Sequence, residues 1–217
     1  MKEIEIMPES NFLDALVDEL QPVRPALPWA RAITIWTLAS SLFVAAALLW
    51  SGPLRVGFVS DLSSLRLLGE LGLGAATSLA VIAAAFEIGV PGAPSMARLL
   101  GPAAFLGASW LGLTLLGDAL PGPTHSMLGK RAHCFSESLA VSLPPAGIAL
   151  VLLRRRLMWA HGAAGSLVGA AAASMAALGM QLACMYEPEH ALRFHFSPIL
   201  LVAVAGAAAG HFFMARD

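Results

Sequence analysis

The chain has 217 residues, of which 58% are hydrophobic and 12% are charged, and its net charge is −1. A soluble domain has about 25% charged residues, so this sequence has too few polar side chains to cover a water-soluble globule of its size. The near-neutral charge argues against direct nucleic-acid binding, because phosphate recognition requires a basic surface. No stretch of apolar/polar alternation suggests a β-barrel, so the composition predicts packed helices.

Residues 1–29 form a polar segment ahead of the first apolar run. The start is acidic and lacks a positively charged region followed by an apolar core, so we expect no secretory signal peptide. Five apolar residues recur at helical spacing on one side of this segment: Phe12, Leu13, Leu16, Val17 and Leu20. The other side is acidic, whereas a helix lying on an anionic leaflet should be basic. This helix therefore suits a basic protein partner, or it folds back onto the chain's own loops.

Six apolar windows follow, each close to the roughly 20 residues that a helix needs to cross a bilayer core. They are Ala32–Trp50, Glu70–Val90, Leu99–Leu116, Phe135–Leu153, Gly162–Ala183 and Phe196–Phe213. Backbone amides cannot stay unpaired in hydrocarbon, so these runs must be helical. The sequence predicts an all-α polytopic membrane protein, with residues 1–29 as a cytoplasmic segment and residues 30–217 as a six-helix transmembrane domain.

Positive charge predicts the orientation of this domain. Lys and Arg favour the cytoplasmic side, and with the N-terminus inside, eight of the 13 lie on that side, including Arg154, Arg155 and Arg156. We therefore expect both termini in the cytoplasm.

Small residues recur at every fourth position in three windows, which lets helix backbones approach closely. The three stripes are Gly72/Ala76/Ala80/Ala84, Gly165/Gly169/Ala173/Ala177 and Gly206/Gly210. They predict a compact bundle, with a dimer seam as the alternative; the oligomeric state stays open.

The two cysteines, Cys134 and Cys184, lie where the fourth window begins and the fifth ends. Both adjoining loops follow odd-numbered spans, so both cysteines lie on the same side of the membrane, which is the outer side in the predicted orientation. Neighbouring helices lie about 10 Å apart, so the sulfurs can come within disulfide range. Two separate buried thiols are the alternative.

Histidines are concentrated on the same side as the cysteines. Because Cys and His bind zinc, cadmium and copper, three of them are weak candidate ligands: His133, His190 and His195. No CxxC or HxxxH spacing is present, so water-exposed loop histidines are the commoner expectation. The carboxylates Glu70 and Glu137 lie near span ends, where we expect them to reach water. No catalytic motif is recognisable, and we expect neither enzyme activity nor a resident cofactor, beyond transient binding of a heavy metal.

Several short stretches together resemble one family across nearly the whole chain. They are Phe12–Arg24, His133-Cys134-Phe135, Ser142-Leu143-Pro144-Pro145, Leu152–Arg155 and Cys184 ahead of a histidine-containing loop. In their order and spacing they are similar to the NrsF-type membrane anti-sigma factors (negative regulator of sigma F). Each stretch is short, and their common order carries the resemblance.

The resemblance implies a bacterial inner-membrane protein that holds an extracytoplasmic-function sigma factor inactive through its N-terminal segment. Phe12, Leu13, Leu16, Val17 and Leu20 would contact sigma, and the periplasmic cysteines would sense metal or oxidative stress. Two alternatives remain. One is a small transporter or metal-permeation protein with a Cys/His entry site. The other is a quinone-linked thiol oxidoreductase, which the absence of a CxxC pair disfavours.

Overall fold

The computed structural model describes residues 27–119, 130–154 and 160–214, together with Val17, Pro123 and Arg156. Of the predicted N-terminal apolar stripe, Val17 alone is described; it is helical and exposed. Phe12, Leu13, Leu16 and Leu20 lie outside the described residues, so the proposed sigma-binding helix stays a prediction.

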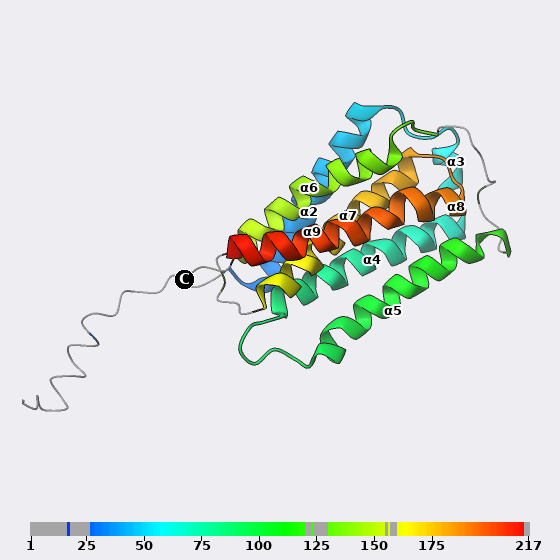
Figure 1. Ribbon diagram of the computed structural model, residues 1–217. Helices are drawn as coiled ribbons and strands as arrows, with labels where there is room; N and C mark the ends of the chain where they lie inside the picture. Colours follow the sequence, from blue (N-terminus) through cyan, green and yellow to red (C-terminus); the bar gives the residue numbers. More distant parts are fainter. Residues whose placement is uncertain are drawn as a thin grey trace, which may run out of the picture.

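The described ranges are helical and contain no extended β-ladder. The long helices, numbered as in Figure 1, are α2 (Trp29–Ser51), α4 (Leu65–Glu87), α5 (Met96–Leu115), α6 (Cys134–Leu153), α7 (His161–Ala183) and α9 (Ser197–Met214). The short elements are α3 (Phe58–Asp61), a 3₁₀ turn (Leu116–Ala119), α8 (Pro188–Ala191) and a π-helical turn (Leu192–Phe196). Six spans are long and apolar enough to cross a membrane, the last one running from Pro188 to Met214. The predicted number of spans is confirmed.

All six spans begin before the windows predicted from the sequence, and two of them begin five or more residues earlier. The α4 helix starts at Leu65, where the Ser64 hydroxyl accepts a hydrogen bond from the Leu67 amide at 3.4 Å. The last span starts at Pro188, where the Glu187 carboxylate accepts one from the His190 amide at 2.7 Å. Such side-chain caps satisfy amides that the first turn leaves unpaired. Hydropathy alone missed both starts because polar residues occupy these first turns.

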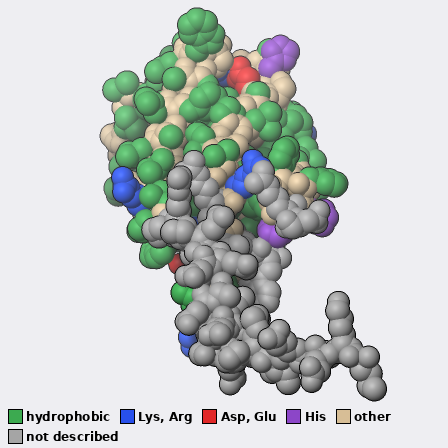
Figure 2. All heavy atoms as spheres, turned by 90° about the vertical axis from the view of Figure 1, so that its left-hand side faces the viewer, with side chains coloured by type: hydrophobic (Ala, Val, Ile, Leu, Met, Phe, Trp, Pro, Cys, Tyr) green, Lys and Arg blue, Asp and Glu red, His purple; other side chains and the backbone are tan. Residues whose placement is uncertain are grey.

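The centre of the bundle is α7. Of its apolar window 78% is buried, against 11–44% for the other five spans. It packs against α9, α4, α6 and α2, whereas α5 lies at the edge of the bundle beside α4 (Figure 1). Large hydrophobic side chains are exposed on the long helices, among them Leu42, Phe105 and Leu200, and the end view in Figure 2 shows mainly hydrophobic side chains with few charges on the described surface. An apolar outside around an equally apolar core is typical of a bundle that lipid surrounds.

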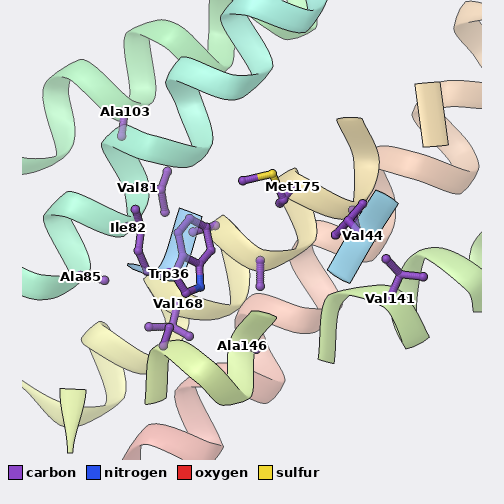
Figure 3. Close-up of a cluster of buried hydrophobic side chains, with 14 of the residues drawn as sticks. Trp36, Val44, Val81, Ile82, Ala85, Ala103, Val141, Ala146, Val168 and Met175 are labelled. Atoms are coloured by element: carbon purple, nitrogen blue, oxygen red, sulfur yellow. The ribbon is translucent and has the colours of Figure 1, made fainter. Parts of the chain in front are cut away.

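A cluster of buried apolar side chains fills the bundle interior (Figure 3). Trp36 of α2 is fully buried there, in the cluster that also holds Ile82 of α4 and Val168 of α7. Its indole N–H donates to the Pro145 carbonyl of α6 at 2.9 Å. This bond satisfies the one polar group of a buried Trp and ties α2 to α6.

The closest helix pair, α7 and α9, meets along glycines. A Cβ atom added to Gly165 or Gly169 of α7 would overlap the backbone of α9, and one added to Gly206 or Gly210 would overlap the backbone of α7. Two of the three predicted small-residue stripes therefore face each other, and close packing is confirmed for them. The third stripe is only partly packed: Gly72 is exposed and a Cβ there would touch nothing, whereas Ala84 at the other end of the stripe is buried in the core.

The bundle has two distinct ends, which lie at opposite sides of Figure 1. The cysteine end holds the last residues of α2, the first of α4 and α6, and residues 183–196. The terminal end holds the first residue of α2 and the last of α9. The two ends are separated by the length of the 23-residue α2, about 35 Å at 1.5 Å per residue.

The glycine seam yields a direct test of helix packing. Gly165→Ala should destabilise the detergent-solubilised protein by on the order of 1–3 kcal/mol, because the new methyl group forces α7 and α9 apart. Gly72→Ala is the matched control: it meets open space and should be neutral or stabilising, since Ala favours a helix by about 1 kcal/mol over Gly. Unfolding curves measure both. Equal effects of the two substitutions would contradict the seam.

Candidate functional site

The two cysteines meet at the cysteine end. Cys134 is the first residue of α6, and Cys184 is the residue directly after α7. Both side chains are buried and free, and their sulfurs lie 2.7 Å apart. Their predicted placement at a common end of the bundle is confirmed. A thiol pair this close can share a proton, hold one metal ion or be oxidised together.

Two histidines complete a cluster with this pair. His190 Nε2 lies 3.3 Å from the Cys184 sulfur, and one potential ligand atom from each of Cys134, Cys184, His190 and His195 lies within 4.8 Å of all the others. All four residues are buried. The expectation of water-exposed histidines was therefore wrong for His190 and His195. The third candidate, His133, is exposed and is not part of the cluster.

A π-helical turn brings the two histidines to the same side. They are five residues apart, which in an α-helix would place them about 140° apart around the axis. Between them the helix widens at Leu192–Phe196, where the Ser197 amide donates to the Leu192 carbonyl five residues back. Such π-bulges are frequent at functional sites. The five-residue spacing of His190 and His195 was therefore not recognisable as a ligand motif, because in an α-helix the two side chains would point in different directions.

The neighbours of Cys184 favour its thiolate. Its contact with the Cys134 thiol and the nearby His195 lower the pKa of Cys184 below its ordinary value, against the opposing effect of burial. Cys134 in turn donates to the Arg131 carbonyl at 3.3 Å. Thiolate character increases both reactivity toward oxidants and affinity for metal ions.

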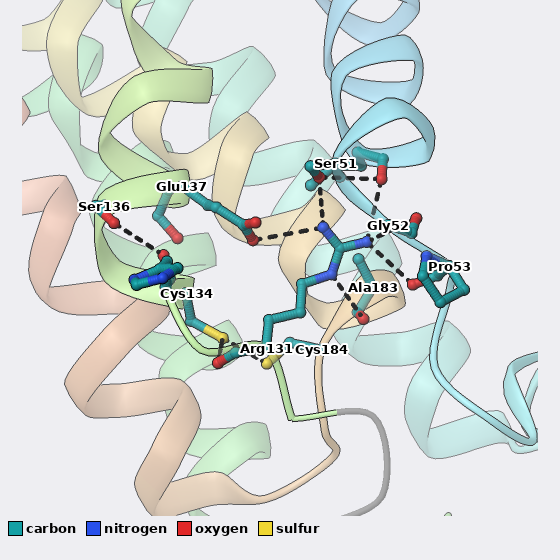
Figure 4. A network of polar contacts seen from close by, with 12 residues as sticks. Ser51, Gly52, Pro53, Arg131, Cys134, Ser136, Glu137, Ala183 and Cys184 are labelled. Atoms are coloured by element: carbon teal, nitrogen blue, oxygen red, sulfur yellow. Dashed lines mark hydrogen bonds and ion pairs between the residues drawn. The ribbon is translucent and has the colours of Figure 1, made fainter.

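Arg131 ties the ends of two helices together beside the cysteines (Figure 4). Its Nη2 donates to the carbonyl oxygens of Leu48, Gly52 and Pro53 at 3.0–3.1 Å, and its Nε donates to that of Ala183 at 3.3 Å. These carbonyls end α2 and α7, where a cation is favourable and the last turn leaves acceptors free. No local sequence pattern indicates this role for Arg131, because its partners lie far from it in the chain.

A second buried polar cluster lies next to the cysteine cluster. Arg66 and Glu70 form an ion pair at 3.1 Å within α4, and the Tyr186 hydroxyl donates to the same Glu70 oxygen at 2.8 Å. Burial and the adjacent Glu70 raise the pKa of Tyr186. A cavity of about 10 Å³, bordered by Glu70, Tyr186 and His195, lies between the two clusters.

This cluster corrects the expectation that Glu70 reaches water. Its side chain has no exposed surface. A buried carboxylate is tolerated when it is paired and hydrogen-bonded, and Arg66 and Tyr186 supply both interactions. The pairing of Glu70 with Arg66 explains why α4 begins about one and a half turns before the predicted apolar window.

At the terminal end, Arg156 holds the chain where it enters α2. Its Nη2 donates to the Leu27 carbonyl at 2.9 Å and its Nη1 to the Phe86 carbonyl at 3.2 Å. Burial lowers the pKa of Arg156. Leu27 follows directly on the residues that the structure does not describe, so this contact fixes the point at which the N-terminal segment joins the bundle.

The fold and the site define a polytopic helical membrane protein whose described ionisable side chains lie towards its two ends. The chain belongs to the family described as NrsF, negative regulator of sigma F, whose model matches residues 16–215. No curated protein and no solved structure matches it. The predicted family is confirmed, and it is a family of regulators that act on a sigma factor.

Arg131 provides a test of how the cysteine end is held closed. Arg131→Lys keeps the charge but replaces a planar fork of five donors by three, so some of the four carbonyls lose their partner. We expect a loss of stability on the order of 1–3 kcal/mol and roughly 10-fold faster alkylation of the buried thiols in detergent, because local opening becomes easier.

Lys130→Ala is the matched control, since this neighbouring cation is exposed and its loss should leave the alkylation rate unchanged. Alkylation of Arg131→Lys at the wild-type rate would show that Arg131 does not restrain the cysteines.

Proposed function

We propose that this protein is a bacterial inner-membrane anti-sigma factor that holds an extracytoplasmic-function sigma factor inactive through residues 1–29. A change of state at Cys134 and Cys184, caused by metal or oxidative stress, releases the sigma factor. One observation carries the proposal: two free thiols lie in contact and buried at one end of the bundle, and α2 begins at the opposite end. Membership of a family of sigma-factor regulators supports release of a sigma factor as the response to this change.

The orientation follows from the same assignment. Sigma factors act in the cytoplasm, so the terminal end, with both termini, faces the cytoplasm, and the cysteine end faces the periplasm. The number of Lys and Arg residues predicted on each side of the membrane favours this orientation. The thiols then meet metal ions and oxidants from outside the cell before these reach the cytoplasm.

The contacts of Arg131 supply a route between the two ends. The turn that carries Arg131 also accepts the Cys134 hydrogen bond, so a change at the sulfurs alters the position of the guanidinium that holds the end of α2. A single rigid helix then connects this point to Leu27 and the N-terminal segment. The ligand or oxidant shifts a population between two packings, of which one binds sigma more tightly.

The alternative of a transporter or metal-permeation protein has less support. Within the described spans, the ionisable side chains lie within eight residues of one end of their span. An ion or proton pathway typically places such groups near the middle of the membrane. The thiol cluster therefore has no described continuation across the bilayer.

Binding to sigma is tested in the N-terminal segment. The double variant Leu16→Asp, Leu20→Asp should abolish co-purification of the full-length protein with the extracytoplasmic-function sigma factor encoded nearest its gene. Two charges placed in a desolvated apolar contact cost several kcal/mol, on the order of a thousandfold in affinity. Insertion into the membrane should be unchanged, because neither residue lies in a span.

The matched control is Ala15→Asp, which adds a charge to the same helix on the side away from the apolar stripe and should leave binding close to wild type. Wild-type binding by the double variant would overturn the assignment of this segment and favour a helix folded back onto the bundle.

A further inference from the structure

Four side chains that can donate to a metal ion converge at the cysteine end from three separate parts of the chain. Cys134 comes from the start of α6, Cys184 from the end of α7, and His190 and His195 from the first turns of the last span. Their ligand atoms all lie within 4.8 Å of one another. Within the described residues this is the one group of its kind.

The spacing of these atoms is close to that of a tetrahedral site. With metal–sulfur bonds of about 2.3 Å and metal–nitrogen bonds of about 2.0–2.1 Å, the edges of a tetrahedron of two sulfurs and two nitrogens are roughly 3.3–3.8 Å long. Cys184 and His190 already lie 3.3 Å apart. The two sulfurs, now 2.7 Å apart, have to separate by about 1 Å, and the outermost ligand has to approach by about 1 Å, to complete the arrangement.

His195 provides an independent indication of a ligand. Its ring is 1% exposed, and neither ring nitrogen makes a hydrogen bond of ordinary geometry in the described part of the chain; the nearby group that it interacts with is the Cys184 thiol. A buried polar atom that lacks a well-formed hydrogen bond destabilises the folded state. A metal ion bound to one nitrogen removes that cost at the side of the ring that faces the sulfurs.

The charge of the four side chains indicates which class of ion the cluster can bind. Two thiolates and two neutral imidazoles carry a charge of −2, so a divalent cation leaves the buried cluster neutral, which avoids the penalty for a net charge in a region of low dielectric constant. Sulfur and imidazole ligands prefer borderline or soft ions, and four-coordinate tetrahedral geometry is typical of zinc and its heavier relatives.

We propose that Cys134, Cys184, His190 and His195 form a closed four-ligand site for a thiophilic divalent d¹⁰ cation, Zn²⁺ or Cd²⁺. The role of this site as the stress sensor rests on the proposed function, whereas metal binding itself does not depend on sigma. Binding releases the thiol protons to solvent and forms two metal–sulfur bonds, with no change of oxidation state.

The test uses the full-length protein, purified in detergent, reduced and stripped of metal. Titration with Co²⁺, as a spectroscopic substitute for zinc, should give the intense visible bands of a tetrahedral site with thiolate charge transfer, saturating at one ion per chain. Zn²⁺ and Cd²⁺ should displace it. His190→Ala and His195→Ala should each weaken binding by about 100-fold or more, beyond the 10–100-fold typical of losing a partner behind a ligand.

His133→Ala is the matched control, because this exposed histidine adjoins Cys134 in sequence and should bind Co²⁺ like the wild type. A weak octahedral Co²⁺ spectrum from the folded wild-type protein would overturn the proposal without use of any variant. So would wild-type affinity in His195→Ala.

Failure of this proposal and failure of the anti-sigma function are distinguishable. Loss of tetrahedral Co²⁺ binding with sigma co-purification intact removes the metal site alone and leaves thiol oxidation as the input. Intact Co²⁺ binding without any sigma association removes the anti-sigma function alone.

Discussion

The arrangement of the whole cysteine end depends on the close contact between α7 and α9. Because Gly165 and Gly169 meet Gly206 and Gly210 without side chains between them, the backbones of the two helices come into direct contact in this register. That register sets the start of the last span beside the end of α7, so the π-helical turn lies against Cys184. Bulkier residues in the seam would separate the helices and remove the histidines from the thiols.

The polar contacts at the two ends then connect this rigid bundle to its function. Arg131 joins the end of α2 to that of α7 beside the cysteines, and Arg156 holds the chain at the start of α2. Between these two points α2 is a continuous helix, anchored to α6 by the Trp36 indole. A small movement at the thiols can therefore change the chain that leaves the bundle on the other side, because packed helices move as units.

Hydropathy was sufficient to predict the six spans, and loop counting was sufficient to place Cys134 and Cys184 at one end. The site itself needed information that a linear pattern does not contain. The five-residue spacing of His190 and His195 becomes a ligand pair only on a π-helical turn. The early start of that span was signalled by Glu187 and Pro188, an acidic cap followed by a proline in the first turn. The partners of Arg131 and Glu70 come from distant residues, which no local pattern indicates.

The central claim is that the state of the thiol cluster and the affinity for sigma are thermodynamically coupled. The most direct measurement is the dissociation constant of the sigma factor for the full-length protein in lipid nanodiscs, reduced and metal-free, then saturated with Cd²⁺, then oxidised. We expect at least one of the last two states to weaken binding by about 5–150-fold, the usual range of allosteric coupling, and the double variant Cys134→Ser, Cys184→Ser to remove the difference. Equal dissociation constants in all three states would contradict this claim.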